Sequence, residues 1–84
     1  MGNYKKLILK ILSGSSDANI DFTELTDTLK RLGFSERIRG SHHIYRKQGI
    51  EEKINLQKDG SKAKPYQVRQ VRALFTRHQI AGDK

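Results

Sequence analysis

No cysteine occurs among the 84 residues of this chain, so no disulfide and no thiolate zinc site can hold its fold together, and no cysteine nucleophile is available. A domain of this length buries roughly 60–65% of the surface that its unfolded chain exposes, so its core is thin. Hydrophobic residues make up only 35% of the sequence. The sequence therefore predicts one small domain over residues 1–84, stabilised by a few segments with regular apolar spacing.

The same features bear on where the protein works. Small secreted domains usually need disulfides, so the absence of cysteine favours the reducing cytoplasm. The longest apolar run is Leu7–Leu9, far short of the ~20 residues that a membrane-spanning helix needs. The first residues also lack the apolar stretch of a signal peptide. We expect a cytoplasmic protein with no membrane contact.

The first two regular segments have the apolar spacing of amphipathic helices. Residues 3–13 carry apolar side chains at the helical i, i+3, i+4, i+7 positions, and a loop follows. Residues 22–32 repeat this pattern. Asp21, which directly precedes them, and Glu24 in their first turn have the three-residue separation of a capping box. Gly33 is the residue type favoured just past a helix C-terminus, so the second helix is expected to end there.

The pattern changes to short β-type segments after this glycine. Strands are predicted at 34–38, 43–47 and 53–57, and the last of them alternates polar and apolar residues with the period of two that a half-buried strand has. Turns are predicted at 39–41 and 48–51, each containing a glycine. Three short strands joined by tight turns imply an antiparallel meander.

The remainder of the chain predicts a turn, a basic segment and a third helix. The turn covers 58–61, and 62–64 leads to Pro65, a residue well suited to the first position of a helix. An apolar stripe then continues to about residue 77, and residues 79–84 are expected to be a flexible tail.

The predicted fold class is therefore α+β, with the element order α-α-β-β-β-α. Two helices packed on one face of a three-stranded antiparallel sheet would bury that face. The last five elements, α-β-β-β-α, have the order of a double-stranded-RNA-binding domain, and the helix at 3–13 is extra. Element order alone is a weak guide to function, because one fold serves many functions.

The formal net charge is +8, which favours a polyanionic partner. Residues 1–33 hold five basic and four acidic side chains, whereas residues 34–84 hold twelve and five. Any basic binding surface is therefore expected in the second half of the chain. Nucleic acid is the preferred partner, with an anionic membrane or a merely basic solvated surface as the alternatives.

Candidate chemistry is concentrated in Arg39–Arg46, where a predicted turn leads into a strand. The segment contains His42 and His43, and histidine exchanges a proton near neutral pH because its unperturbed pKa is about 6.5. A base beside cationic phosphate-binding groups suits RNA cleavage by the 2′-hydroxyl, a route that needs no metal. The structural alternative is that one histidine is an ordinary strand residue and the other caps the turn. Residue chemistry alone favours this alternative.

Strand alternation does not decide between the two histidines. If Ile44 packs inward, His43 and Tyr45 point outward, and His42 shares the side of Ile44 unless the turn swings it clear.

The residues around this segment are candidates for binding phosphate. Arginine can hold a phosphodiester bidentately, glycine permits a tight turn, and a helix N-terminus binds anions. Phosphate or RNA binding is therefore predicted for Arg39, Gly40, Ser41, Arg46, Lys47, Lys62, Lys64 and Arg69.

No metal and no cofactor are expected. Adjacent strand residues point to opposite faces, so His42 and His43 are poorly placed to chelate one ion. The paired carboxylates Glu51 and Glu52 lie at the end of a predicted turn. His78, at the end of the last helix, is best explained by its favourable interaction with the helix dipole.

Several stretches together resemble the HicA toxins of type II toxin–antitoxin modules. They are GSHHIYRK after a helix ending in Leu-Gly-Phe, a polar strand, and KAKPYQVRQVRALF, and they cover residues 22–77. The resemblance implies a double-stranded-RNA-binding-like fold, mRNA-cleaving activity, growth inhibition and a HicB-type antitoxin as partner. It also implies a catalytic histidine after the Gly-Ser pair, which is His42 first and His43 second.

Two other functional classes are compatible with the sequence. One is a non-catalytic RNA-binding module of the same fold. The other is a protein-interaction domain whose basic face binds an acidic partner. Cleavage that is lost on His42→Ala would separate the enzyme from both.

Overall fold

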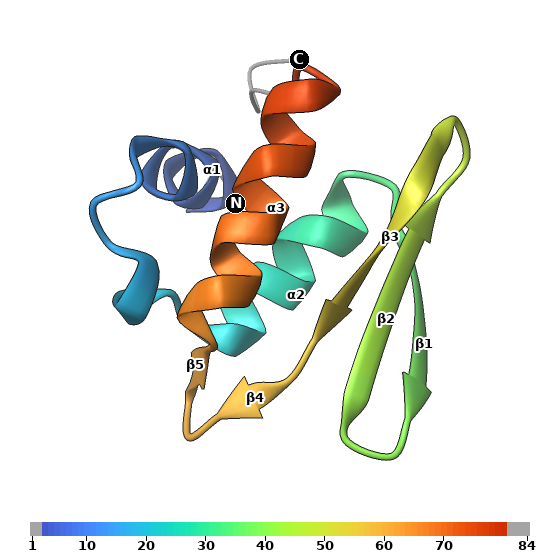
Figure 1. Cartoon of the computed structure of the whole chain (residues 1–84), viewed down its shortest axis with the longest axis horizontal. Helices are drawn as coiled ribbons and strands as arrows, with labels where there is room; N and C mark the ends of the chain where they lie inside the picture. Colours follow the sequence, from blue (N-terminus) through green and yellow to red (C-terminus); the bar gives the residue numbers. More distant parts are fainter. Residues whose placement is uncertain (1–2, 81–84) are drawn as a thin grey trace.

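The computed structural model describes residues 3–80 and contains three α-helices and two small antiparallel sheets within them (Figure 1). The elements follow the order α1 (Asn3–Ser13), η1 (Asp17–Asn19), α2 (Phe22–Arg31), β1 (Ser35–Arg39), β2 (His42–Lys47), β3 (Ile50–Leu56), β4 (Lys58–Asp59), β5 (Lys62–Ala63) and α3 (Pro65–Arg77). This confirms the predicted α+β class and the predicted order of the helices and of the first three strands.

The main sheet has the antiparallel order β1-β2-β3, and its helices lie on one side (Figure 1). Helix α3 packs on β3, and α1 packs on α2 and α3. The side chains of Tyr45, Ile54 and Leu56 enter the core from this helix-facing side. The other side of the sheet, which we call the open face, carries the alternate residues, and no helix within residues 3–80 covers it (Figure 1).

The ends of α2 follow the predicted capping chemistry. The Asp21 carboxylate accepts a hydrogen bond from the Glu24 backbone N–H at 3.0 Å, which satisfies one of the free donors of the first turn. At the other end Gly33 has a φ of 99°, a left-handed conformation that glycine adopts without steric cost. The Phe34 N–H then donates to the Leu29 carbonyl, and Phe34 is buried in the core. The chain therefore leaves α2 at Gly33 and enters β1 at Ser35.

Helix α1 is an integral part of the core. Its Leu7, Ile8 and Ile11 are at most 5% exposed and pack with residues of α2 and α3. Arg72 of α3 donates two hydrogen bonds to the Asp17 carboxylate and one to the Ile11 carbonyl, so it also joins α3 to the loop after α1.

The segment between the sheet and α3 is more ordered than the sequence predicted. Residues 58–63, expected to be a turn and a basic lead-in, form the β4–β5 hairpin. The Phe22 N–H, one of the free donors at the start of α2, binds the Ser61 carbonyl at 3.0 Å. The Ala63 N–H binds the Ile20 carbonyl at 2.9 Å. The hairpin therefore joins the starts of α2 and α3, a long-range pairing that local sequence patterns do not reveal.

Of the tail predicted at 79–84, residues 81–84 lie outside the described range, and the first two residues form the C-terminal end of α3. Gln79 has a φ of 57°, and its N–H points at the Thr76 carbonyl. The Ile80 N–H donates to the Phe75 carbonyl at 2.8 Å, and Ile80 packs against the core. Together they form a Schellman-type end to α3, with glutamine in the position that glycine usually takes.

The two faces of β2 are the reverse of the arrangement considered from the sequence, in which Ile44 packs inward and His43 and Tyr45 point outward. Tyr45, not Ile44, packs inward, and Ile44 lies on the open face. The Tyr45 side chain is fully buried because its hydroxyl finds an acceptor there, the carboxylate of Glu36 directly across on β1. Burial raises the pKa of Tyr45, and its hydrogen bond holds the pKa of Glu36 below the usual 4.5.

Replacing Tyr45 with phenylalanine is expected to lower the free energy of unfolding by about 1.5–3 kcal/mol at pH 7, because the mutation removes a hydrogen bond to a charged acceptor. The lowered pKa of Glu36 adds stability above pH 4.5 that is lost as the pH falls through the folded-state pKa. The difference between wild type and variant should therefore shrink in acid. Urea unfolding at several pH values measures it, with Tyr4→Phe as control. A difference that grows in acid would contradict this assignment.

Candidate nucleic-acid interface

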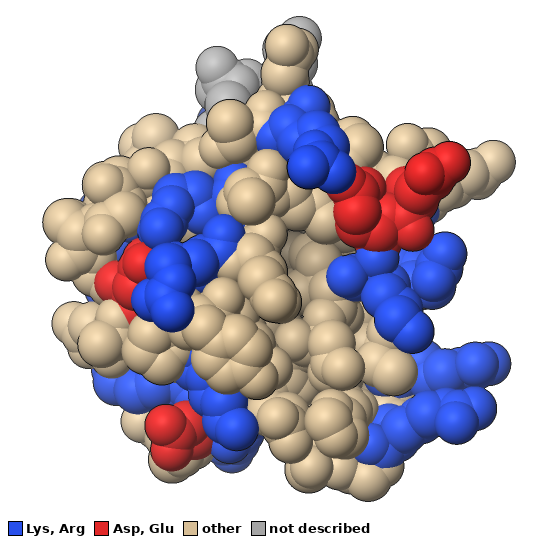
Figure 2. All heavy atoms as spheres, viewed as in Figure 1, with Lys and Arg blue, Asp and Glu red and all other residues tan. Residues whose placement is uncertain are grey.

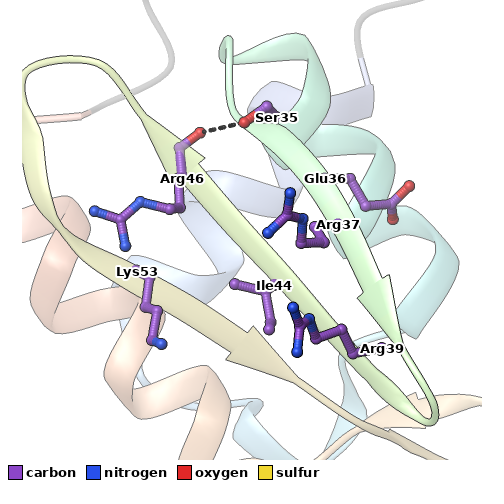
Figure 3. A pocket seen from close by; sticks show the side chains of 7 residues that line it. All are labelled: Ser35, Glu36, Arg37, Arg39, Ile44, Arg46 and Lys53. Carbon is purple, nitrogen blue, oxygen red and sulfur yellow. Dashed lines mark hydrogen bonds between the residues drawn. The ribbon is translucent and has the colours of Figure 1, made fainter.

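The open face of the sheet forms a hollow lined by positive charge. Arg37 and Arg39 of β1, Arg46 of β2 and Lys53 of β3 line it together with Ser35, Glu36 and Ile44 (Figure 3). The Glu36 side chain points away from this hollow, toward Tyr45 (Figure 3). In Figure 2, Lys and Arg atoms gather along the sheet side of the molecule, to the right of the view.

Strand register brings these cations together. Arg37 lies opposite Ile44, Arg39 opposite His42 and Ser35 opposite Arg46. In β3 the side chains of Ile54 and Leu56 point into the core. Because successive side chains of a strand point to opposite faces, Lys53 and Asn55 lie on the open face. Alternation with a period of two therefore places every second residue of three strands on one surface.

His42 lies at the end of this face beside the β1–β2 turn. It is exposed, lies directly across from Arg39, and its Nδ1 is 3.2 Å from Oδ1 of Asn55. The turn consists of Gly40 and Ser41, and Gly40 has a φ of 58°, as the first central residue of a type II′ hairpin turn requires. The tight turn brings His42 directly across from the last residue of β1.

His43 lies on the opposite side of the sheet. Its ring packs edge-on against Phe22, with the ring centroids 5.0 Å apart. Its Nδ1 is buried 3.5 Å from Oε2 of Glu36 and has no hydrogen-bond partner within the described residues. The two adjacent histidines thus occupy different environments, one exposed among cations and one packed against an aromatic ring.

Ser41 and Lys64 are connected to the site through Gln57. The Gln57 side chain donates to the Ser41 hydroxyl at 3.3 Å and accepts from the Lys64 ammonium at 3.4 Å. Its backbone N–H donates to Oε1 of the buried Gln67 on α3. The turn before His42 is therefore tied to the start of α3.

The other three predicted phosphate ligands lie away from the open face. The Lys47 ammonium lies over Gly33 at the C-terminal end of α2, where a positive charge interacts favourably with the helix dipole. Lys62 belongs to the β4–β5 hairpin. Arg69 of α3 lies near Asp17, whose pKa is lowered chiefly by its hydrogen bond to Arg72 and also by the charge of Arg69. These residues do not join the cluster around His42.

Sequence reasoning missed Arg37, Lys53 and Asn55. A signal for the last two was present, because the alternation in 53–57 separates polar from apolar residues. Which polar residues meet across the sheet depends on register, and the register was not predicted.

His78 has a partner of its own at the far end of the sheet. Its Nε2 lies 2.9 Å from Oε1 of Glu52, and Arg77 binds the other carboxylate oxygen. The hydrogen bond to His78, more than any other contact, lowers the pKa of Glu52 to about 2. These contacts fasten the end of α3 to β3 and leave His78 outside the candidate site.

Comparison with protein-family models, with curated proteins and with solved structures gives no match for this chain. Among residues 3–80, no group of three His, Asp or Glu side chains is arranged to hold a metal ion. No helix in the same range is long and apolar enough to cross a membrane.

Proposed function

We propose that this chain is a metal-independent endoribonuclease that cleaves mRNA in the cytoplasm, as the toxin of a type II toxin–antitoxin module with a HicB-type antitoxin as partner. The observation that supports it is the position of His42, an exposed imidazole on the same surface as Arg37, Arg39, Arg46 and Lys53. The resemblance of residues 22–77 to HicA toxins points to the same activity.

The proposed reaction is transesterification at one phosphodiester. His42 removes the proton from a ribose 2′-hydroxyl, the O2′–P bond forms, and the P–O5′ bond breaks. Arg39, across from His42, stabilises the charge that develops on the phosphorane oxygens. The leaving O5′ takes up a proton from water and His42 returns its proton to the solvent, which gives a 5′-hydroxyl and a 2′,3′-cyclic phosphate. Arg37, Arg46 and Lys53 bind neighbouring phosphates.

The requirement for a 2′-hydroxyl provides the test. Purified protein in EDTA is expected to cleave a synthetic RNA and to leave a 2′,3′-cyclic phosphate, which mass spectrometry identifies. The same oligonucleotide with a single 2′-deoxy sugar at the mapped site should be bound and left intact there. Cleavage that persists at the deoxy position, or a 3′-hydroxyl product, would overturn the mechanism.

A non-catalytic RNA-binding module is the second candidate, and the position of His43 favours it. With His43 on the helix-facing side, His42 is the one imidazole on the open face within the described residues, so no second histidine serves as the acid. A pure binder would show steeply salt-dependent RNA affinity and no cleavage product in the same assay.

A further inference from the structure

We propose that Asn55 is a positioning residue that keeps the proton of neutral His42 on Nδ1 and so leaves Nε2 as the proton-accepting atom. The catalytic consequence rests on the proposed function, whereas the placement of the proton does not.

The contact between the two side chains has a defined direction. Oδ1 of Asn55 carries no proton and can only accept a hydrogen bond, so the facing Nδ1 of His42, 3.2 Å away, is the donor. A neutral imidazole carries one proton, and with that proton on Nδ1 the lone pair is on Nε2. An Asn55 amide turned over would present its NH₂ group and require the opposite tautomer, so the proton position distinguishes the two orientations.

The position of Asn55 in β3 fixes where its side chain can contact His42. Its neighbours Ile54 and Leu56 are buried in the core, and Asn55 lies across from Ile44, diagonal to His42. Diagonal neighbours in an antiparallel sheet are within reach of longer side chains. Two residues further on, just after β3, the Gln57 side chain donates to the Ser41 hydroxyl. Asn55 and Gln57 therefore contact His42 and Ser41 respectively.

The consequence for catalysis is that the base is oriented before RNA arrives. An exposed imidazole without this contact would rotate and exchange tautomers, and only one tautomer in one orientation presents a lone pair to the 2′-hydroxyl. Second-sphere partners that fix the tautomer of a histidine in this way affect affinity or activity by about 10–100-fold at metal sites. We expect a loss of rate of similar size here.

The test compares wild type with Asn55→Leu, which removes the acceptor, and Asn55→Asp, which keeps one. Imidazole ¹⁵N shifts at alkaline pH should show His42 with its proton on Nδ1 in wild type and Asn55→Asp, and a mixture of tautomers in Asn55→Leu. RNA cleavage should fall about 10–100-fold in Asn55→Leu and be largely retained in Asn55→Asp. Gln48→Leu, an exposed amide in the β2–β3 turn, is the matched control and should behave as wild type.

The two proposals fail in distinguishable ways. A proton on Nε2 of His42 in wild type would overturn the role of Asn55 whatever the cleavage assay shows. Full cleavage by a folded Asn55→Leu would overturn it as well. Absence of cleavage by wild type would overturn the proposed function. The ¹⁵N shifts would still show which ring nitrogen of His42 carries the proton.

Discussion

Replacing His42 with alanine is expected to lower the rate of RNA cleavage by about 10²–10⁴-fold, the usual contribution of a general base, with RNA affinity nearly unchanged. The exposed ring of His42 is not part of the core, so the fold should tolerate its removal. The four cations of the open face remain in the variant and continue to bind phosphate. Single-turnover cleavage and a binding titration on the same RNA measure the two quantities separately.

His43→Ala is the matched control, because it removes the neighbouring imidazole from the opposite side of the sheet. It should lower stability through the lost contact with Phe22 and leave the cleavage rate per folded molecule close to wild type. The reverse result, with cleavage lost in a folded His43→Ala and retained in His42→Ala, would contradict the assignment of the base.

The helices could be predicted because their signals are local. Asp21 and Glu24 are three residues apart, Gly33 follows directly on the last turn of α2, and Pro65 opens α3. Each of these residues acts on backbone groups within one turn of itself, so neighbouring sequence determines its effect. The structure confirms all of them.

The faces of the sheet could not be predicted in the same way. Ile44 and Tyr45 are both apolar enough to be buried, and the sequence of β2 alone does not choose between them. The choice depends on Glu36, which accepts the Tyr45 hydroxyl, and on the pairing of Tyr45 with Ile54 in β3. Both partners come from other strands, so the decision requires the register.

The composition of the candidate site also depends on the strand register. The Gly40-Ser41-His42 motif marked one end of it, because the three residues are consecutive. Arg37 and Lys53 are 16 positions apart in the sequence and share a surface only through two strand pairings. A charge count over 34–84 shows that a basic surface exists in this half and does not show which side of the sheet carries it.

Helix α1 lies outside residues 22–77, the stretch for which toxin activity is proposed, and its buried residues imply that residues 22–77 do not complete the core. Replacing Ile8 with alanine is therefore expected to cost about 2–5 kcal/mol, the usual loss for a large buried aliphatic side chain. Ile8 is fully buried in the core, on a helix that packs on α2 and α3. At about 4–8 °C per kcal/mol for a domain of this size, the melting temperature should fall by roughly 8–40 °C.

Leu9→Ala is the matched control on the same helix. Leu9 is 61% exposed, so its truncation should change the free energy of unfolding by no more than about 0.5 kcal/mol. If Ile8→Ala leaves too little folded protein to measure, Ile8→Val should still lose about 0.5–1.5 kcal/mol in urea unfolding. Equal, small effects at positions 8 and 9 would mean that α1 is an appendage. The pair of results thus decides whether the nuclease fold proposed here requires its first helix for stability.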